Sequence, residues 1–301
     1  MDGGAQPSDL SGLAQFAAEL GGLKRVRDAS SPRSLAERFF RSAWQRLVGG
    51  DDPAETAYAV SGHVIAAIRL AGLTHDLMAE LGVADPLLIM QNAYDEVCNP
   101  IRDPVRGLLR RSLGHSIERT DIVPGFVEQL TAQPRAGATC PGMPRLILQP
   151  PESHADHCLV VAVLGVVLAA QYGADPATVF IAGLAHHLHN ATLPDSGFSG
   201  EVLLGAELDP LIKRLFASRI GELSAPLADH IRQALSAIEG IGTAEARAFH
   251  AADVLDRVLQ MRHYESVARF RLADAMDTME LVHAGPVQSF HLAVLRQAGL
   301  S

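Results

Sequence analysis

Three histidines, His186, His187 and His189, lie within four residues at the end of an apolar segment in the stretch AGLAHHLHNATLPD. Each neutral imidazole carries one hydrogen-bond donor and one acceptor that need partners, so packing alone does not gather several imidazoles at the end of a core helix. Transition metals do gather them, because imidazole nitrogen is a common metal ligand in proteins. The cluster therefore predicts a metal site at the end of this segment.

Two residues far from this cluster complete a possible ligand set. His157 begins an apolar segment upstream, and Asp253 lies downstream in the stretch FHAADVLDRV. The alanines beside Asp253 predict a tightly packed helix, where an unpaired carboxylate would be costly. Either a metal ion or a buried arginine would satisfy that carboxylate. We expect the metal ligands to be His157, His186, His187 and Asp253.

Further histidines are predicted outside the ligand set, where they would orient a ligand or contact a substrate. His154 is three residues before His157, and His250 is three residues before Asp253, so each pair shares a helix face. Asp256, which is followed by Arg257, has the pattern of an ordinary surface ion pair. The residues expected in this outer group are His154, His189, His230 and His250.

Composition limits the class of protein. The chain has 301 residues, 48% of them hydrophobic, and a net charge of −9, so it can bury a large core but lacks the basic field that duplex nucleic acid or an anionic membrane requires. Three cysteines without metal-knuckle spacing suit a reducing compartment. The first residues carry no secretory signal pattern, and the longest apolar run, 158–170, is too short to cross a bilayer. We expect a cytoplasmic protein with no duplex nucleic acid or membrane partner.

The elements that must position these residues are predicted to be helices. Ser34 and Asp175 stand where helix N-caps belong, and no segment shows sustained alternation of apolar and polar residues, so the fold class is all-α. In the last part of the chain we expect helices at 207–219, 224–239, 243–263, 265–282 and 285–298. The predicted organisation is a flexible, Gly- and Ser-rich N-terminus at 1–33, an N-terminal helical region of unassigned role at 34–132, a proline-rich linker or extended arm at 133–153 and a metal-binding helical domain at 154–301.

The stretch PESHADHCLVVAVLGVVLAAQYGADPATVFIAGLAHHLHNATLPD resembles the opening of the HD domain, an all-α metal-binding fold of phosphohydrolases that includes nucleotidases and cyclic-dinucleotide phosphodiesterases. The HD pattern has a His on one helix, a His-Asp pair further on and a final Asp near the end of the domain. His157, His186 and Asp253 match the first His, the His of the pair and the final Asp. Leu193-Pro194-Asp195 is similar to the Ile-Pro-Asp of the phosphodiesterase branch. The resemblance covers about residues 150–265 and implies an HD-like helical bundle with an additional N-terminal helical region.

The chain departs from this pattern at two positions. His187 stands where the family has the Asp of the pair, and Asn190 stands where many active members have Lys or Glu beside the metal, so Asn190 joins the expected outer group. A carboxylate can bridge two metals, whereas a neutral imidazole cannot, so we expect one metal. Three imidazoles and one carboxylate leave a divalent ion with a surplus positive charge that attracts an anionic group. This nitrogen-rich set favours one divalent transition metal: iron, manganese, cobalt, nickel or zinc.

Three functions are open on these grounds. The first is a metal-dependent hydrolase of a phosphate ester or nucleotide-like small molecule, with Asp195 or Glu201 moving protons, unless both only cap the loop after the helix. Arg145 is similar to a phosphate clamp of the nucleotidase branch, but a solvated arginine is an equal alternative. The second function is an HD-type non-heme iron oxygenase on a small organic substrate, and the third is a non-catalytic HD-like binding module. The expected partner is a small anionic substrate, and a homo-oligomer is left open.

Overall fold

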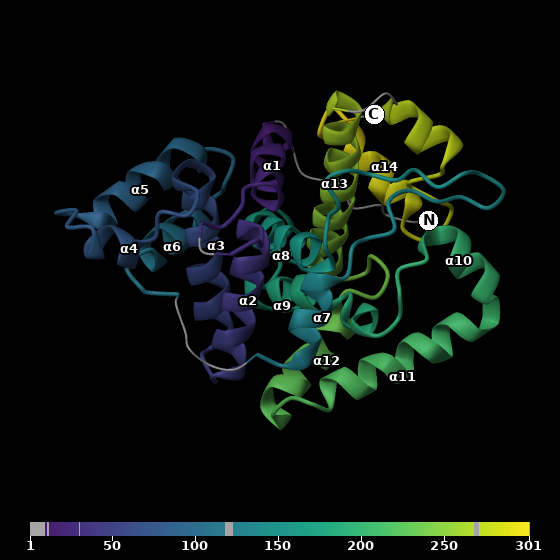
Figure 1. Ribbon diagram of the computed structural model, residues 1–301, viewed down its shortest axis with the longest axis horizontal. Helices are drawn as coiled ribbons and strands as arrows, with labels where there is room; N and C mark the ends of the chain where they lie inside the picture. The colour runs from purple at the N-terminus through teal and green to yellow at the C-terminus, as the bar shows by residue number, and fades with distance from the viewer. Residues whose placement is uncertain (1–9, 11, 30, 118–122, 268–270, 301) are drawn as a thin grey trace.

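The computed structural model describes residues 10, 12–29, 31–117, 123–267 and 271–300 (Figure 1). Within these ranges the chain forms helices joined by loops, and its only β-type pairing is three isolated bridges. The predicted all-α fold class is therefore confirmed. The helices of the N-terminal region are α1 (Leu13–Gly21), η1 (Gly22–Lys24), α2 (Leu35–Val48), α3 (Pro53–Leu70), α4 (His75–Glu80), α5 (Pro86–Val97), α6 (Val105–Ser112) and α7 (Gly125–Ala132).

The later elements begin with the central helix of the molecule, which is buried from His154 to Ala169. Its Ser153 N-cap forms a capping box with Asp156, and the left-handed Gly173 ends it. Its length and apolar composition would suffice to cross a membrane, but 83% of its apolar window is buried inside the protein. The elements are α8 (His154–Tyr172), α9 (Pro176–Ala185), η2 (Leu188–Ala191), α10 (Gly197–Leu204), η3 (Gly205–Glu207), α11 (Leu208–Ile220), α12 (Ala225–Ala237), α13 (Ala244–Val267), a π-helical turn (Asp274–Thr278) and α14 (Gln288–Gln297).

Helix α8 packs most extensively against α9 and α13, and this three-helix contact positions the candidate site. A glycine permits the closest approach, because a Cβ atom added at Gly183 would lie 2.5 Å from the Cα atom of Ala162. The end of α9 is thereby held directly against α8.

Two expectations differ from the structure. The helix expected at 265–282 does not form as one element: α13 continues to Val267, residues 268–270 lie outside the described part, and a separate π-helical turn follows. The Asp274 carboxylate accepts the backbone N–H of Arg271 at 3.0 Å and starts this new turn. In the expected flexible segment 1–33, residues 1–9, 11 and 30 are not described, but Leu13–Gly21 forms α1 and buries Leu13, Phe16 and Leu20. Their helical spacing outweighs the glycines and serines of the segment.

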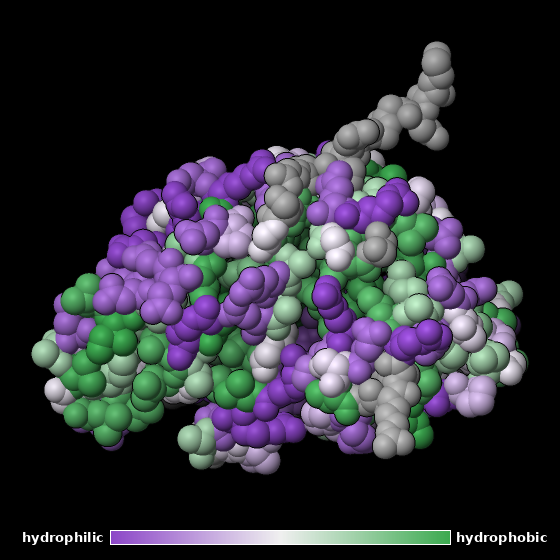
Figure 2. Space-filling model, turned by 90° about the horizontal axis from the view of Figure 1, so that it is seen from above, coloured by the Kyte–Doolittle hydropathy of each residue, from purple (hydrophilic) through white to green (hydrophobic). Residues whose placement is uncertain are grey.

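One continuous apolar core joins the N-terminal helices to α8, α9, α13 and α14. The segment 133–153 is an extended arm that folds back on itself, with bridges between Pro134 and Ser153 and between Ala138 and Leu146. A second, smaller apolar cluster lies beneath this arm. Figure 2 shows apolar surface at the α4–α5 end, on the left of the molecule, where several side chains are exposed: Leu77, Leu81, Leu88 and Ile89.

Candidate metal centre

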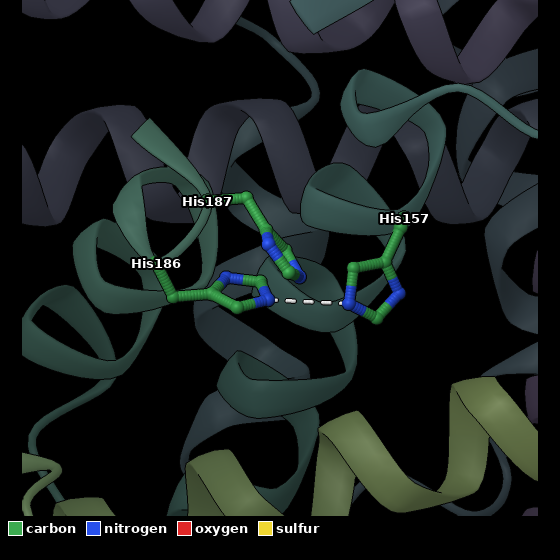
Figure 3. A group of neighbouring side chains, drawn as sticks. All are labelled: His157, His186 and His187. Atoms are coloured by element: carbon green, nitrogen blue, oxygen red, sulfur yellow. Dashed lines mark hydrogen bonds between the residues drawn. The ribbon is translucent and has the colours of Figure 1, made fainter. Parts of the chain in front are cut away.

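Three helices bring the four predicted ligands to one place. His157 lies in the first turn of α8, and Asp253 lies on α13. His186 directly follows α9, where the backbone leaves the helix, and His187 has φ −109° and ψ 19°. Two adjacent residues on a regular helix would point about 100° apart. The irregular backbone at this helix end instead lets His186 and His187 turn toward the same point (Figure 3).

The distances between the facing atoms suit a shared cation. His157 Nε2 lies 3.1 Å from His186 Nε2 and 3.3 Å from Asp253 Oδ1. The ring centroids of His186 and His187 are 4.3 Å apart, and one nitrogen of each of the three histidines lies within 4.8 Å of the others. Ligands at about 2.0–2.2 Å from a metal ion are roughly 3–3.5 Å from one another. The spacing of the three histidine nitrogens therefore fits a single ion, and Asp253 adjoins this group through its contact with His157.

The hydrogen bonds of His157 and His186 fix which ring nitrogen carries the proton. His157 Nδ1 lies 2.7 Å from an oxygen of Asp256, and His186 Nδ1 lies 2.8 Å from the carbonyl oxygen of Gly183. A carbonyl oxygen can only accept a hydrogen bond, and the Asp256 carboxylate, which contacts the Lys24 ammonium group, likewise accepts. Each Nδ1 therefore donates, and the Nε2 of the neutral His186 ring presents a lone pair to His157.

Asn190 fixes the orientation of His187 in the same way. His187 Nδ1 lies 2.8 Å from Asn190 Oδ1, while Asn190 Nδ2 donates to the carbonyl oxygen of Leu193 at 3.2 Å. The second hydrogen bond sets the orientation of the amide, so its oxygen must accept the proton of His187 Nδ1. His187 Nε2 is left with a lone pair. An outer partner that holds the distal nitrogen of a histidine is a general feature of metal sites.

The buried rings are held neutral. Burial, with the neighbouring His157 ring, lowers the pKa of His186 to about 3, and burial next to His186 holds the pKa of His187 well below its ordinary value. The lone pair of His186 Nε2 thus faces His157 Nε2 at 3.1 Å. A cation between these two nitrogens would take a lone pair from each ring in place of any proton on His157 Nε2.

Asp253 contacts an arginine, which is one of the two partners that its sequence context suggested, and also a histidine. One oxygen faces His157, and the other lies 3.7 Å from Arg257 Nη1. Burial raises the pKa of Asp253, but the hydrogen bond with His157 and the charge of Arg257 outweigh it and hold this pKa well below its ordinary value. The carboxylate is therefore ionised and can contribute an anionic ligand.

The outer histidines are placed unevenly around this centre. His154 is fully buried, its ring centroid lies 4.9 Å from that of His187, and burial lowers its pKa to about 2. His189 packs against Phe216 on α11, and burial lowers its pKa to about 4. His250 lies beside the centre with Nε2 3.0 Å from the carbonyl oxygen of Ile238. The structure does not bring His230 to the centre, because it is exposed on α12 and lines no part of the adjacent cavity.

Asp195 and Arg145 connect the arm to the start of α10. The two oxygens of Asp195 accept the backbone N–H groups of Ala136 and Gly197 at 2.8 and 2.9 Å. Arg145 donates to the carbonyl oxygens of Ala136 and Ser196 at 3.1 and 3.2 Å. Both side chains border the cavity, but their polar atoms hold the loop together, which was the structural alternative for Asp195.

Glu201 lies on the cavity wall and differs from Asp195 because its carboxyl group has no hydrogen-bond partner within the described chain. Burial, together with the charge of Asp195, raises the pKa of the Glu201 carboxyl group. This carboxyl group therefore holds a proton at higher pH than an ordinary glutamate does.

Sequence reasoning missed the layer behind His157. The expectation that Asp256 forms a surface ion pair is wrong, because Asp256 is only 3% exposed and contacts His157 and Lys24 instead. Lys24 Nζ also forms an ion pair with Glu152. The position of Asp256, one turn after Asp253, was an available signal, whereas nothing in the sequence near Lys24 indicated its role.

A cavity of about 730 Å³ opens beside the centre. His186, His187 and Asp253 form part of its wall, and the arm, α10, α13 and the segment after the π-helical turn form the rest. Three arginines also border it: Arg135, Arg145 and Arg257. The volume is large enough for a small organic substrate.

The fold and the centre define an all-α protein with a cluster of histidine and aspartate side chains that could hold a metal ion. A family model of the HD domain matches residues 127–283, which is more than half of the chain. The protein therefore belongs to the HD domain family, a superfamily of metal-dependent phosphohydrolases. The match includes α7 and the arm, which precede the region of resemblance found in the sequence. No curated protein and no solved structure matches the chain.

Proposed function

We propose that this protein is a metal-dependent hydrolase that cleaves a phosphate ester in a small anionic molecule, with nucleotide-like substrates included. The observation that carries the proposal is the convergence of one nitrogen from each of three imidazoles, with the Asp253 carboxylate 3.3 Å from His157, beside a cavity of about 730 Å³. Membership of the HD domain family supports it.

The residues present fit a divalent transition metal. The Nε2 atoms of His157 and His186 face each other at 3.1 Å, and Asp253 adds an anionic oxygen 3.3 Å from His157 Nε2. His157, His186, His187 and Asp253 would hold the ion, and nitrogen-rich ligation favours iron, manganese, cobalt, nickel or zinc. Such an ion would supply Lewis-acid polarisation of a phosphoryl oxygen and would acidify a water molecule.

Arg135 and Arg257 would bind the anionic group. Arg257 borders the cavity, and its Nη2 donates to the carbonyl oxygen of Leu281 at 2.5 Å, which holds the cation next to Asp253. Arg135 Nη1 is buried without a hydrogen-bond partner in the described part of the chain. This free N–H group on the cavity wall is better suited to a phosphate oxygen than Arg145, whose donors are used by the loop.

Glu201 would donate a proton to the leaving group. Its pKa is raised by burial and by Asp195, which is the direction that a general acid near neutral pH requires. Asp195 would act indirectly, through its charge and through its hold on the arm.

The reducing cytoplasm is the proposed location. All three cysteines are free: Cys98, Cys140 and Cys158. Free thiols, two of them buried, support an intracellular protein.

The test is phosphate release by the purified full-length protein from a panel of phosphate mono- and diesters, with each divalent metal added in turn. We expect turnover by the wild type and by His230→Ala, which changes an exposed residue away from the centre, and loss of turnover in His186→Ala. Metal-dependent oxygen uptake without phosphate release would refute hydrolysis and favour the oxygenase. Metal binding without either reaction would favour the binding module.

A further inference from the structure

Lys24 reaches the metal centre from a part of the chain outside the HD match. It ends η1, directly after α1, and only 1% of its side chain is exposed. Its Nζ atom lies 2.6 and 2.7 Å from the two oxygens of Asp256 and also bonds Glu152. An ammonium group is thus buried between two carboxylates.

The choice of lysine at this position is unusual for this chain. The sequence contains two lysines and 23 arginines, and the other lysine, Lys213, is exposed on α11. A compact ammonium group can serve several oxygens around one point, whereas the planar guanidinium of arginine cannot. The site therefore uses the side chain that best concentrates a positive charge in a small buried space.

The contacts form a continuous chain from Lys24 to the metal centre. Asp256 Oδ2 lies 2.7 Å from Lys24 Nζ and 2.7 Å from His157 Nδ1. Burial raises the pKa of Asp256, but the charge of Lys24 and the hydrogen bond with His157 lower it to about 2. The neighbouring carboxylates also raise the pKa of Lys24 against the effect of its burial. The contact of Lys24 Nζ with both oxygens of Asp256 is therefore a buried ion pair.

This arrangement also removes a competing cation site. Glu152, His157 and Asp256 form a second group of atoms close enough to hold a metal ion. Lys24 Nζ contacts both carboxylates of that group, so the chain supplies the cation itself. A divalent ion is left with the Nε2 side of His157.

We propose that Lys24 is a positioning residue of the metal centre: its ammonium group balances Asp256, which in turn holds His157 with its Nε2 lone pair directed at the ion. The inference rests on the proposed metal centre and does not depend on which reaction the protein catalyses. It makes α1 and η1 part of the centre, although they lie outside residues 127–283.

The test is the affinity of the metal-free, full-length protein for Co²⁺, measured by absorbance titration. We expect Lys24→Met to weaken binding by about 10- to 100-fold, the usual effect of losing an outer partner of a ligand. Lys213→Met is the matched control and should bind as the wild type does. A weakening that is absent, or a gain in affinity, would overturn the proposal.

A double variant separates positioning from general damage to the fold. Asp256→Asn keeps an oxygen for His157 Nδ1 but removes the charge that Lys24 balances. Lys24→Met/Asp256→Asn should therefore bind Co²⁺ within a few-fold of Asp256→Asn alone, and with the same visible absorption spectrum, even if Lys24→Met by itself fails to fold. If the double variant instead loses Co²⁺ affinity by the product of the losses of the two single variants, Lys24 has a merely structural role and the proposal is refuted.

The same titration distinguishes this inference from the proposed function. Tight Co²⁺ binding without phosphate release would reject hydrolysis and leave the role of Lys24 intact. Failure of the wild type to bind Co²⁺ would reject both.

Discussion

His63 in α3 and His186 after α9 are both imidazoles that donate from Nδ1 to a backbone carbonyl one turn earlier. The acceptors are Ala59 at 2.9 Å and Gly183 at 2.8 Å, and burial lowers the two pKa values to about 4 and about 3. Only His186 faces other imidazoles, since no histidine ring contacts His63 within the described ranges. A buried, hydrogen-bonded histidine is therefore an ordinary feature of this fold, and the convergence of several Nε2 atoms is what marks a metal site.

The largest difference between His186 and His63 is expected when each histidine is removed and the bound metal is measured. We expect His186→Ala to lose essentially all metal, because a ligand matters more than an outer partner, whose loss costs about 10- to 100-fold in affinity. His63→Ala should retain the metal content of the wild type. Elemental analysis after dialysis measures both, and equal metal contents would end the distinction between the two sites.

Removal of the metal should change the free energy of unfolding of His63→Ala but not that of His186→Ala. An ion at a thousand times its dissociation constant adds about 4 kcal/mol to the free energy of unfolding, and a chelator removes that gain. The midpoint of denaturant unfolding should therefore fall on chelation in the wild type and in His63→Ala. In His186→Ala the unfolding midpoint should not change when the chelator is added. A fall as large as that of the wild type would show that the ion binds elsewhere.

The hydrogen-bond acceptors of the two histidines also differ. His187 Nδ1 donates to the side chain of Asn190, which can be mutated, whereas His63 Nδ1 donates to a backbone carbonyl. Asn190→Ala removes the oxygen that accepts the proton of His187 Nδ1, so we expect metal affinity to fall by about 10- to 100-fold. Asn190→Asp keeps an accepting oxygen and should lose less. Competition with a chromophoric chelator gives both affinities, and an equal loss in the two variants would argue against orientation by this bond.

The smallest effect is expected in the pH dependence of the metal-free protein. His63 has a pKa of about 4 in the folded state and an ordinary value near 6.5 when unfolded, so between these values only the unfolded chain takes up its proton. Stability should therefore fall as the pH is lowered through this window, by about 1.4 kcal/mol per pH unit for each such histidine. His63→Gln should reduce this slope by one proton, and the exposed His230→Gln should leave it unchanged. Unfolding curves from pH 6.5 to 4 measure the slopes, and an unaltered slope in His63→Gln would contradict the burial argument.

Local signals in the sequence were sufficient for most helices. Ser34 and Asp175 cap helices as predicted, because the capping interactions involve residues only a few positions apart. The segment 1–33 was expected to be flexible because its glycines and serines were weighted above the spacing of the apolar residues at 13–21. Its partner helix, α13, is more than 200 residues away, and the chain pattern alone does not reveal that contact.

In the candidate site, too, some residues could be predicted from the sequence and others depend on contacts between distant segments. His186 and His187 were found through the histidine cluster, and His157, His186 and Asp253 match the HD pattern. The structure brings the three histidine nitrogens together and places Asp253 beside His157. Lys24 and Glu152 belong to no motif. They reach Asp256 only through the docking of α1 and the arm on α13, so their role depends on tertiary packing.

The continuous core has a consequence for how this protein can be divided. Helices α1 to α3 pack with α8, α9 and α13 in a single apolar cluster. Excision of residues 127–283 would expose that face to solvent and invite aggregation. Residues 127–283 are therefore not expected to fold when they are moved alone into another protein. The N-terminal helices of this chain supply the apolar surface against which that segment folds.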